Sequence, residues 1–231
     1  MYTDHTAMLD ALPRMRMGDR QFSSFHIGGG TYSVPRAWAF RGHSDITVAE
    51  IDPAVTEAAA REFWFDPASA SVIHEDARSF LGSNHRQYDV IVGDAFTDIA
   101  VPAHLVTTEF FELVSTRLLP SGVFVMNVVD RVDSLEALAA LYRTLQVVFP
   151  SVEVWTEATP PQPNERRVFV LLASQTDSRV SQIETRTPEP KSFSPLATKF
   201  MDDLVVRTNA PALSDDFAPI DRLMGMASVL D

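Results

Sequence analysis

The stretch FHIGGGTYSVPRAW, residues 25–38, places three consecutive glycines directly after an apolar run. The apolar residues predict a buried strand over residues 22–27, which the glycines end. Glycine adopts positive φ angles without steric cost and lets a ligand lie against the main chain. Proline is tolerated in the first turn of a helix, so residues 35–40 predict a helix directly after the loop. The stretch therefore predicts a strand, a glycine loop against which a ligand lies, and a helix.

The same alternation of strands and helices continues along the chain. Apolar residues at helical spacing predict helices over residues 53–65, 109–119 and 134–149. The strands between them are continuously apolar, which is typical of a parallel sheet covered on both faces. A proline-rich turn at residues 158–166 indicates that the last two strands pair antiparallel at one edge. The predicted fold class is α/β, a doubly wound, mostly parallel sheet of seven strands over residues 22–27, 45–51, 71–76, 88–96, 123–129, 151–157 and 167–174.

The 231 residues suffice for one ample domain with an appendage. Residues 1–21 are predicted to form an N-terminal extension, with a short helix near residues 6–12 that stops at Pro13. Residues 22–175 form the predicted ligand-binding, Rossmann-like catalytic domain. Residues 176–231 are expected to begin as a polar linker, to form a helix over residues 196–206, and to pack on the same domain.

The composition excludes several classes of protein. The net charge of −12 would repel a nucleic-acid backbone, whereas cationic ligands match it, although solubility alone also explains it. Cysteine is absent, which excludes disulfides and a cysteine nucleophile and favours the cytoplasm. No apolar run reaches the about 18 residues of a membrane span, and no secretory leader is expected. The six histidines show no paired spacing, so no metal site is predicted.

Acidic residues stand at the ends of the strands that follow the glycine loop. Ligands of doubly wound sheets bind beyond the carboxyl ends of the parallel strands. Glu50 and Asp52, Glu75 and Asp76, and Asp94 each come at such an end. We therefore expect these acids to converge with the glycines on one crevice.

The spacing between the glycines and the first acid indicates the class of ligand. Glu50 lies about twenty residues after the loop, where an acid binds ribose hydroxyls in dinucleotide-binding folds. A pyrophosphate clamp would need a third spaced glycine where this chain has Ser33. The further acids Glu75 and Asp76 suit a cation or a purine amino group better than phosphates. The predicted ligand is a sulfonium nucleoside of the S-adenosylmethionine type.

Five motifs, in order and at their spacing, resemble those of spermidine synthase-like proteins, which are polyamine aminopropyltransferases on the class I S-adenosylmethionine-dependent methyltransferase fold. The resemblance covers residues 22–174, and SDDFAPIDRL at residues 214–223 is similar to a C-terminal motif of the family. It implies a transferase, a polyamine substrate, and often a homodimer. The five motifs are HIGGGTYSVPRAW, ITVAEIDPAV, VIHEDARSFL, YDVIVGDAF and GVFVMNVVD.

The resemblance implies that seven residues hold the donor nucleoside. Gly28, Gly29 and Gly30 would line its methionine-derived chain and its ribose. Glu50 would bind the ribose hydroxyls, and Ile51 would pack on the adenine. Asp76 with Ala77 would contact the adenine edge.

The resemblance places two further acids near the transferred group. Asp94 would face the sulfonium and the incoming amine, as the catalytic base and as part of the amine site, and Asp98 would belong to the same amine site. These residue types suit the chemistry, because an attacking ammonium must first lose a proton and a carboxylate both accepts it and orients the amine.

Three departures from the family pattern affect the predicted reaction. Thr31 stands where the family's loop has an aspartate, so an aminopropyl amine would lose an acidic partner. The catalytic loop, Asp-Ser-Ser/Thr-Asp-Pro in the synthases, is DAFTDIAVP at residues 94–102, which displaces Asp98 by one position. The β-rich N-terminal segment of the synthases is not expected in residues 1–21.

The favoured function is transfer of an aminopropyl group from decarboxylated S-adenosylmethionine to a polyamine such as putrescine, without a metal. Thr31 favours methyl transfer from S-adenosylmethionine as an alternative, because it removes a clash with the carboxylate of the intact cofactor. A non-catalytic nucleoside-binding module is the other alternative.

Overall fold

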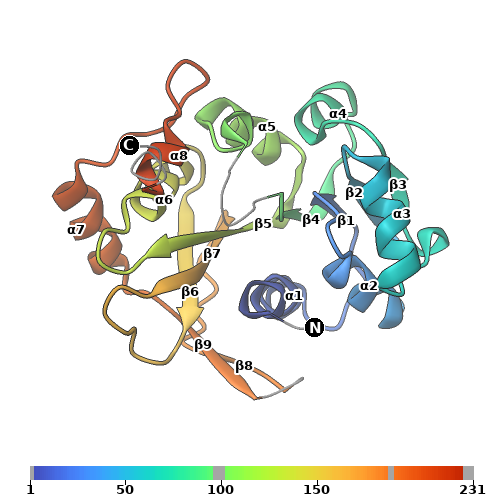
Figure 1. Cartoon of the computed structure of the whole chain (residues 1–231), viewed down its shortest axis with the longest axis horizontal. Helices are drawn as coiled ribbons and strands as arrows, with labels where there is room; N and C mark the ends of the chain where they lie inside the picture. Colours follow the sequence, from blue (N-terminus) through green and yellow to red (C-terminus); the bar gives the residue numbers. More distant parts are fainter. Residues whose placement is uncertain (1–2, 96–101, 187–189, 226–231) are drawn as a thin grey trace.

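The computed structural model describes residues 3–95, 102–186 and 190–225, which form one sheet of nine strands with helices on both faces (Figure 1). The strand order is β3-β2-β1-β4-β5-β7-β6-β9-β8. The strands are β1 Ser24–Ile27, β2 Ile46–Ala49, β3 Ser71–Ile73, β4 Tyr88–Gly93, β5 Leu118–Arg131, β6 Ser151–Glu157, β7 Arg166–Ser174, β8 Ile183–Thr185 and β9 Lys191–Pro195. The helices are α1 Asp4–Met17, α2 Ser33–Phe40, α3 Pro53–Glu62, η1 Pro67–Ser69, α4 Ala77–Ser83, η2 Ala103–Leu105, α5 Thr108–Thr116, α6 Glu136–Val148, α7 Thr198–Thr208 and α8 Ile220–Leu223.

The sheet is parallel at its centre and antiparallel towards one edge. Strands β3, β2, β1, β4 and β5 pair in parallel. Strand β7 inserts antiparallel between β5 and β6, and β9 and β8 continue the antiparallel part. The predicted α/β class and the antiparallel pairing of β6 with β7 are confirmed. The described residues add two strands, β8 and β9, to the seven predicted.

Strands β8 and β9 lie where a polar linker was predicted. Strand β9 pairs with β6, and its Phe193 is fully buried. One apolar residue among polar neighbours and prolines is no local signal for a strand, because the stabilisation comes from pairing with a distant strand. The predicted domain limits at residues 21 and 175 stay predictions.

Helix α1 is longer than predicted and contains Pro13 in its interior. An interior proline costs about 3 kcal/mol, since it removes a hydrogen bond and crowds the preceding turn. Met8, Leu9 and Leu12 are fully buried in the core that α1 shares with the sheet. Each such side chain contributes about 1.5–3 kcal/mol, so packing on the sheet outweighs the cost of the proline.

The other predicted helices are present and differ from prediction at their ends, whereas α4, α8 and the short helices η1 and η2 were not predicted. Helix α2 begins at Ser33 rather than at Pro35, which lies in its first turn as expected. Helix α7 is displaced by two residues from the predicted 196–206. Thr107 caps α5, where its hydroxyl accepts a hydrogen bond from the Phe110 amide at 3.2 Å. Within the described ranges, none of the helices combines the length and the apolar character of a membrane span.

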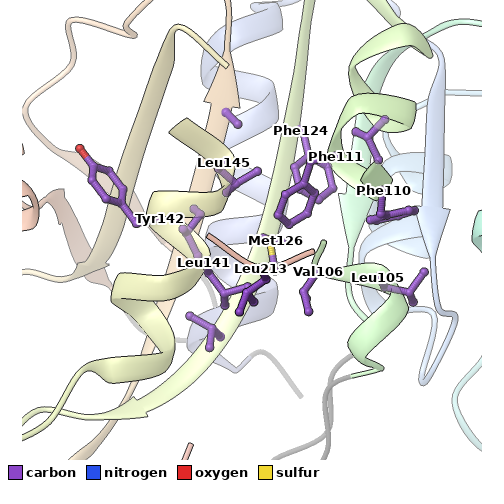
Figure 2. Close-up of a cluster of buried hydrophobic side chains, with 14 of the residues drawn as sticks. Leu105, Val106, Phe110, Phe111, Phe124, Met126, Leu141, Tyr142, Leu145 and Leu213 are labelled. Atoms are coloured by element: carbon purple, nitrogen blue, oxygen red, sulfur yellow. The ribbon is translucent and has the colours of Figure 1, made fainter. Parts of the chain in front are cut away.

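Two apolar cores lie on the two faces of the sheet. Helices α1, α2 and α3 cover one face, and α4, α5, α6 and α7 cover the other (Figure 1). Figure 2 shows the second core between α5, α6 and β5. The side chains labelled there are Leu105, Val106, Phe110, Phe111, Phe124, Met126, Leu141, Tyr142, Leu145 and Leu213.

A buried carboxylate joins α1 to α2, the helix that follows the glycine loop. Asp10 of α1 accepts hydrogen bonds from the Trp38 indole at 2.8 Å and from the guanidinium groups of Arg14 at 2.9 Å and Arg41 at 2.8 Å. Its side chain is only 4% exposed. The network therefore fixes the C-terminal end of α2 against α1, which packs on the same face of the sheet.

We expect Asp10→Ala to destabilise the protein by about 2–4 kcal/mol, because it leaves the buried Trp38 donor and two guanidinium groups without their acceptor. Urea denaturation measures the change. The control is Asp203→Ala, which removes a solvent-exposed ion pair with Lys199 and is expected to change stability by at most about 0.5 kcal/mol. Equal stability changes in both variants would contradict the structural role of Asp10.

Candidate active site

Three backbone hydrogen bonds continue the sheet beyond the carboxyl ends of its parallel strands. The N–H of Asp94, which follows β4, donates to Ile27 of β1 at 2.9 Å. The N–H of Gly28 donates to β2 at 2.9 Å, and that of Glu50 to β3 at 3.0 Å. The structure thus brings the first glycine and two of the predicted acids side by side.

The three glycines differ in what a side chain would meet at each position. Gly28 has φ +89°, and a Cβ there would lie 2.8 Å from the carbonyl oxygen of Asp94. A Cβ on Gly29 would lie 2.4 Å from the ring of Tyr32. Gly30 has φ +51° with nothing within 4 Å of its missing Cβ. Packing of the protein itself therefore requires the first two glycines, and only the third leaves its Cβ position open.

A cavity of about 350 Å³ lies at these strand ends. It brings together six of the seven residues predicted to hold the donor, and also the predicted base. Gly29 does not line it, and Asp98 lies outside the described residues. The described lining residues are Ile27, Gly28, Gly30, Ala49, Glu50, Ile51, Val55, Glu75, Asp76, Ala77, Asp94, Ala95, Pro102, His104 and Leu105.

Glu50 connects the glycine loop to the end of β2. Its carboxylate, in a residue 8% exposed, accepts hydrogen bonds from the Gly29 amide at 2.8 Å and the Asp52 amide at 3.0 Å. The amide of Gly30 lies farther from it, at 3.4 Å. An ionised carboxylate offers about four acceptor positions, so capacity remains for ribose hydroxyls. The carboxylate also orders the loop, a role that the sequence did not indicate.

An apolar side chain and a helix start form one end of the cavity. Ile51 is 69% exposed and lines the cavity, as a residue that packs on a ligand would. Asp76 caps α4 by accepting from the Ser79 amide at 2.9 Å, and Ala77 is the first residue of that helix. Burial acts to raise the pKa of Asp76, but the hydrogen bonds from Ser79 and His104 outweigh it, and the net shift is downward.

Asp94 also lines the cavity but has a different electrostatic environment. Burial raises the pKa of Asp94 to about 7. A carboxyl group that titrates near neutral pH accepts and releases a proton more effectively than an ordinary aspartate. This environment suits a general base.

Asn127 is a candidate site residue that the sequence reasoning missed. Gly93 of β4 pairs with Met126 of β5, so Asn127 lies level with Asp94 on the neighbouring strand. It is 5% exposed, and its Oδ1 has no hydrogen-bond partner among the described residues. A buried acceptor without a donor costs about 1–3 kcal/mol, so a water or ligand that donates to Asn127 would be stabilising, although Asn127 is not among the described residues that line the cavity. The available signal was one amide residue within an apolar strand.

The C-terminal motif is attached to the outer wall of the site. Asp215 accepts two hydrogen bonds from the Arg78 guanidinium, at 2.7 and 2.6 Å, and one from Thr107 at 2.7 Å. The Arg78 contact is the main cause that lowers the pKa of Asp215 to about 2. Asp215 thus joins α4 to α5 and does not line the cavity. Among the residues that the structure describes, no three His, Asp or Glu side chains are grouped as metal ligands.

Comparison with known proteins supports the predicted resemblance. The spermine/spermidine synthase domain family matches residues 25–182. A probable polyamine aminopropyl transferase of Bifidobacterium longum is 30% identical over 95% of this chain and 52% of that protein. An N-terminal histidine N-methyltransferase of Emericella nidulans is 32% identical over 84% of this chain and 34% of that protein. The chain thus spans about half of one relative and a third of the other.

A solved structure confirms the fold. The crystal structure of a probable spermidine synthase from Corynebacterium glutamicum matches with a TM-score of 0.71 and 21% sequence identity. The match covers 91% of this chain and 78% of that chain. The predicted methyltransferase-type α/β sheet is therefore present.

Gly28→Ala and Gly30→Ala form a matched pair, because both sites have positive φ but only Gly28 is crowded by neighbouring backbone. We expect Gly30→Ala to cost about 1–2 kcal/mol from the left-handed conformation alone. Gly28→Ala should cost more, because residues 94 and 95 must also move. Urea denaturation of the two variants measures the difference, and equal losses would contradict the close approach of the two strand ends.

The raised pKa of Asp94 predicts a specific dependence of stability on pH. The folded state binds this proton up to about pH 7, whereas an unfolded aspartate releases it near 3.8. The contribution of Asp94 to stability therefore falls as the pH rises between these values. Asp94→Asn should be more stable than the unmodified protein by at least about 1 kcal/mol at pH 8, with little difference at pH 4. Urea denaturation at both pH values tests this, and a constant difference would refute it.

Proposed function

Because the chain belongs to the spermine/spermidine synthase domain family, we propose that it transfers an aminopropyl group from decarboxylated S-adenosylmethionine to a polyamine such as putrescine. The observation that carries the proposal is the cavity in which the glycine loop, Glu50 and Asp94 meet. The donor and the acceptor are both cationic, and the cavity is lined by acidic side chains. The family supplies the class of reaction, and the site supplies residues that suit it.

The proposed donor lies with its ribose near Glu50 and its adenine near α4. The free acceptor positions of Glu50 take the ribose hydroxyls, while the open Cα face of Gly30 admits close approach of the ligand. Ile51 packs on one face of the adenine ring. Asp76 accepts from the amino group at the adenine edge, next to Ala77.

In the proposed reaction the amine nitrogen of the acceptor attacks the propyl carbon attached to sulfur. The new N–C bond forms as the C–S bond breaks, and the bonding electrons return to the sulfonium, which becomes the neutral thioether of methylthioadenosine. The attacking ammonium transfers one proton to Asp94, whose pKa of about 7 suits this exchange. The Oδ1 of Asn127, which lies level with Asp94 and has no hydrogen-bond partner among the described residues, would accept a hydrogen bond from the same amine and hold it in line.

Methyl transfer from S-adenosylmethionine is the second candidate. Thr31 carries no charge, and its hydroxyl contacts that of Ser33 at 2.8 Å. Position 31 therefore supplies no acid to bind the amine of an aminopropyl group. It also supplies no negative charge to repel the carboxylate of intact S-adenosylmethionine. The named N-methyltransferase among the relatives supports this alternative.

Calorimetric titration with decarboxylated S-adenosylmethionine, S-adenosylmethionine and methylthioadenosine, followed by incubation with putrescine, tests the proposal. We expect preference for the decarboxylated donor and formation of spermidine, because the acidic cavity favours the donor with the greater positive charge. Binding of the intact cofactor without spermidine would favour methyl transfer. Absence of nucleoside binding would overturn both candidates and the non-catalytic nucleoside-binding module as well.

Asp94→Asn provides the matched variant for this assay. It should abolish spermidine formation, since an amide does not accept the proton, while the affinity for methylthioadenosine stays within about twofold, because Asp94 faces the amine rather than the nucleoside. Turnover that survives the substitution would remove Asp94 from the mechanism.

A further inference from the structure

A histidine and an aspartate face each other across one end of the cavity. His104 belongs to η2 and Asp76 precedes α4, and both line the cavity. The His104 Nε2 lies 2.9 Å from Asp76 Oδ2, with the side chains 51% and 29% exposed. An ion pair this exposed contributes only about 0–1 kcal/mol to stability. The contact matters more for a ligand in the cavity, because it orients the Asp76 carboxylate.

The main chain at His104 is fixed as well as its ring. Arg78 donates to the carbonyl oxygen of His104 at 2.9 Å and is itself held by two hydrogen bonds to Asp215. Thr107, three residues after His104, donates to the same carboxylate. The segment that carries His104 is therefore attached to α4 at both its backbone and its side chain.

These contacts determine the plane of the Asp76 carboxylate. Its Oδ1 accepts from the Ser79 amide at 2.9 Å, its Oδ2 contacts His104 at 2.9 Å, and the Ser79 side chain adds a further hydrogen bond to the carboxylate. An ionised carboxylate keeps further acceptor capacity on each oxygen, now in a fixed direction. An amino group at position 6 of a purine can donate to it. A 6-oxo purine would place a carbonyl oxygen, an acceptor, where the amino group donates, so only its N1–H could donate and its binding at this edge would weaken.

We propose that His104 is a positioning residue, which fixes the Asp76 carboxylate and thereby makes the site select a 6-amino purine over a 6-oxo purine. The inference rests on the proposed function, because it presumes that a nucleoside occupies the cavity. His104 acts through Asp76. Its role is therefore visible in the selectivity between bases rather than in the chemistry of transfer.

The test is calorimetric titration of 5′-methylthioadenosine and 5′-methylthioinosine, which differ only around position 6 of the base. We expect His104→Ala to weaken methylthioadenosine binding roughly threefold to tenfold, the scale of one charge-assisted hydrogen bond, with little change for methylthioinosine. His104→Gln, whose side-chain amide can still donate to Asp76, should keep most of the selectivity. His85→Ala is the control, because His85 is an exposed histidine that contacts Arg117 away from the cavity.

The outcomes separate this inference from the proposed function. If the unmodified protein binds neither nucleoside, both fall. If it binds methylthioadenosine selectively but His104→Ala keeps the ratio of the two affinities, or lowers both affinities equally, the positioning role is overturned and the proposed function stands. Loss of the selectivity for methylthioadenosine over methylthioinosine in His104→Ala, together with its recovery in His104→Gln, supports the inference. The melting temperatures of the variants show that each is folded.

Discussion

The site depends on the backbone hydrogen bonds that carry the sheet past the ends of its parallel strands. They fix the spacing between Gly28, Glu50 and Asp94 before any side chain contributes. The same closeness excludes a side chain at residue 28, because its Cβ would meet the carbonyl oxygen of Asp94. Gly28, which the sequence predicted as a residue that lines the ligand, is thus required first by the packing of the strand ends. The absence of a side chain there also leaves space for a ligand.

Two carboxylates in the cavity are held in opposite ways, and this difference separates their proposed roles. Glu50 accepts hydrogen bonds from the backbone amides of Gly29 and Asp52, which fix the direction of its carboxylate. Burial instead raises the pKa of Asp94 towards neutrality. An acceptor held in a fixed direction suits binding of hydroxyl groups, while a group poised between its two protonation states suits transfer of a proton.

Much of the site could be predicted from the sequence because its acids follow strands directly. Parallel strand ends must meet at one edge, so Glu50, Asp76 and Asp94 converge whatever the loops do. The significance of His104 and Asn127 depends on partners about 30 residues away, and nothing local marks it. Strand β9 and the full length of α1 were missed for a related reason, since tertiary pairing and packing stabilise them against their local sequence.

Thr31 shows how the charge of the site could select the donor without the family's usual acid. Of the described residues that line the cavity, Glu50, Glu75, Asp76 and Asp94 are acidic and only His104 is basic. Decarboxylated S-adenosylmethionine carries a sulfonium and an ammonium, whereas the intact cofactor adds a carboxylate that this cavity would repel. In the proposed reaction the product methylthioadenosine is neutral, so transfer would remove the attraction that held the donor. An acidic cavity thereby favours the charged substrate over the spent product even though residue 31 contributes no charge.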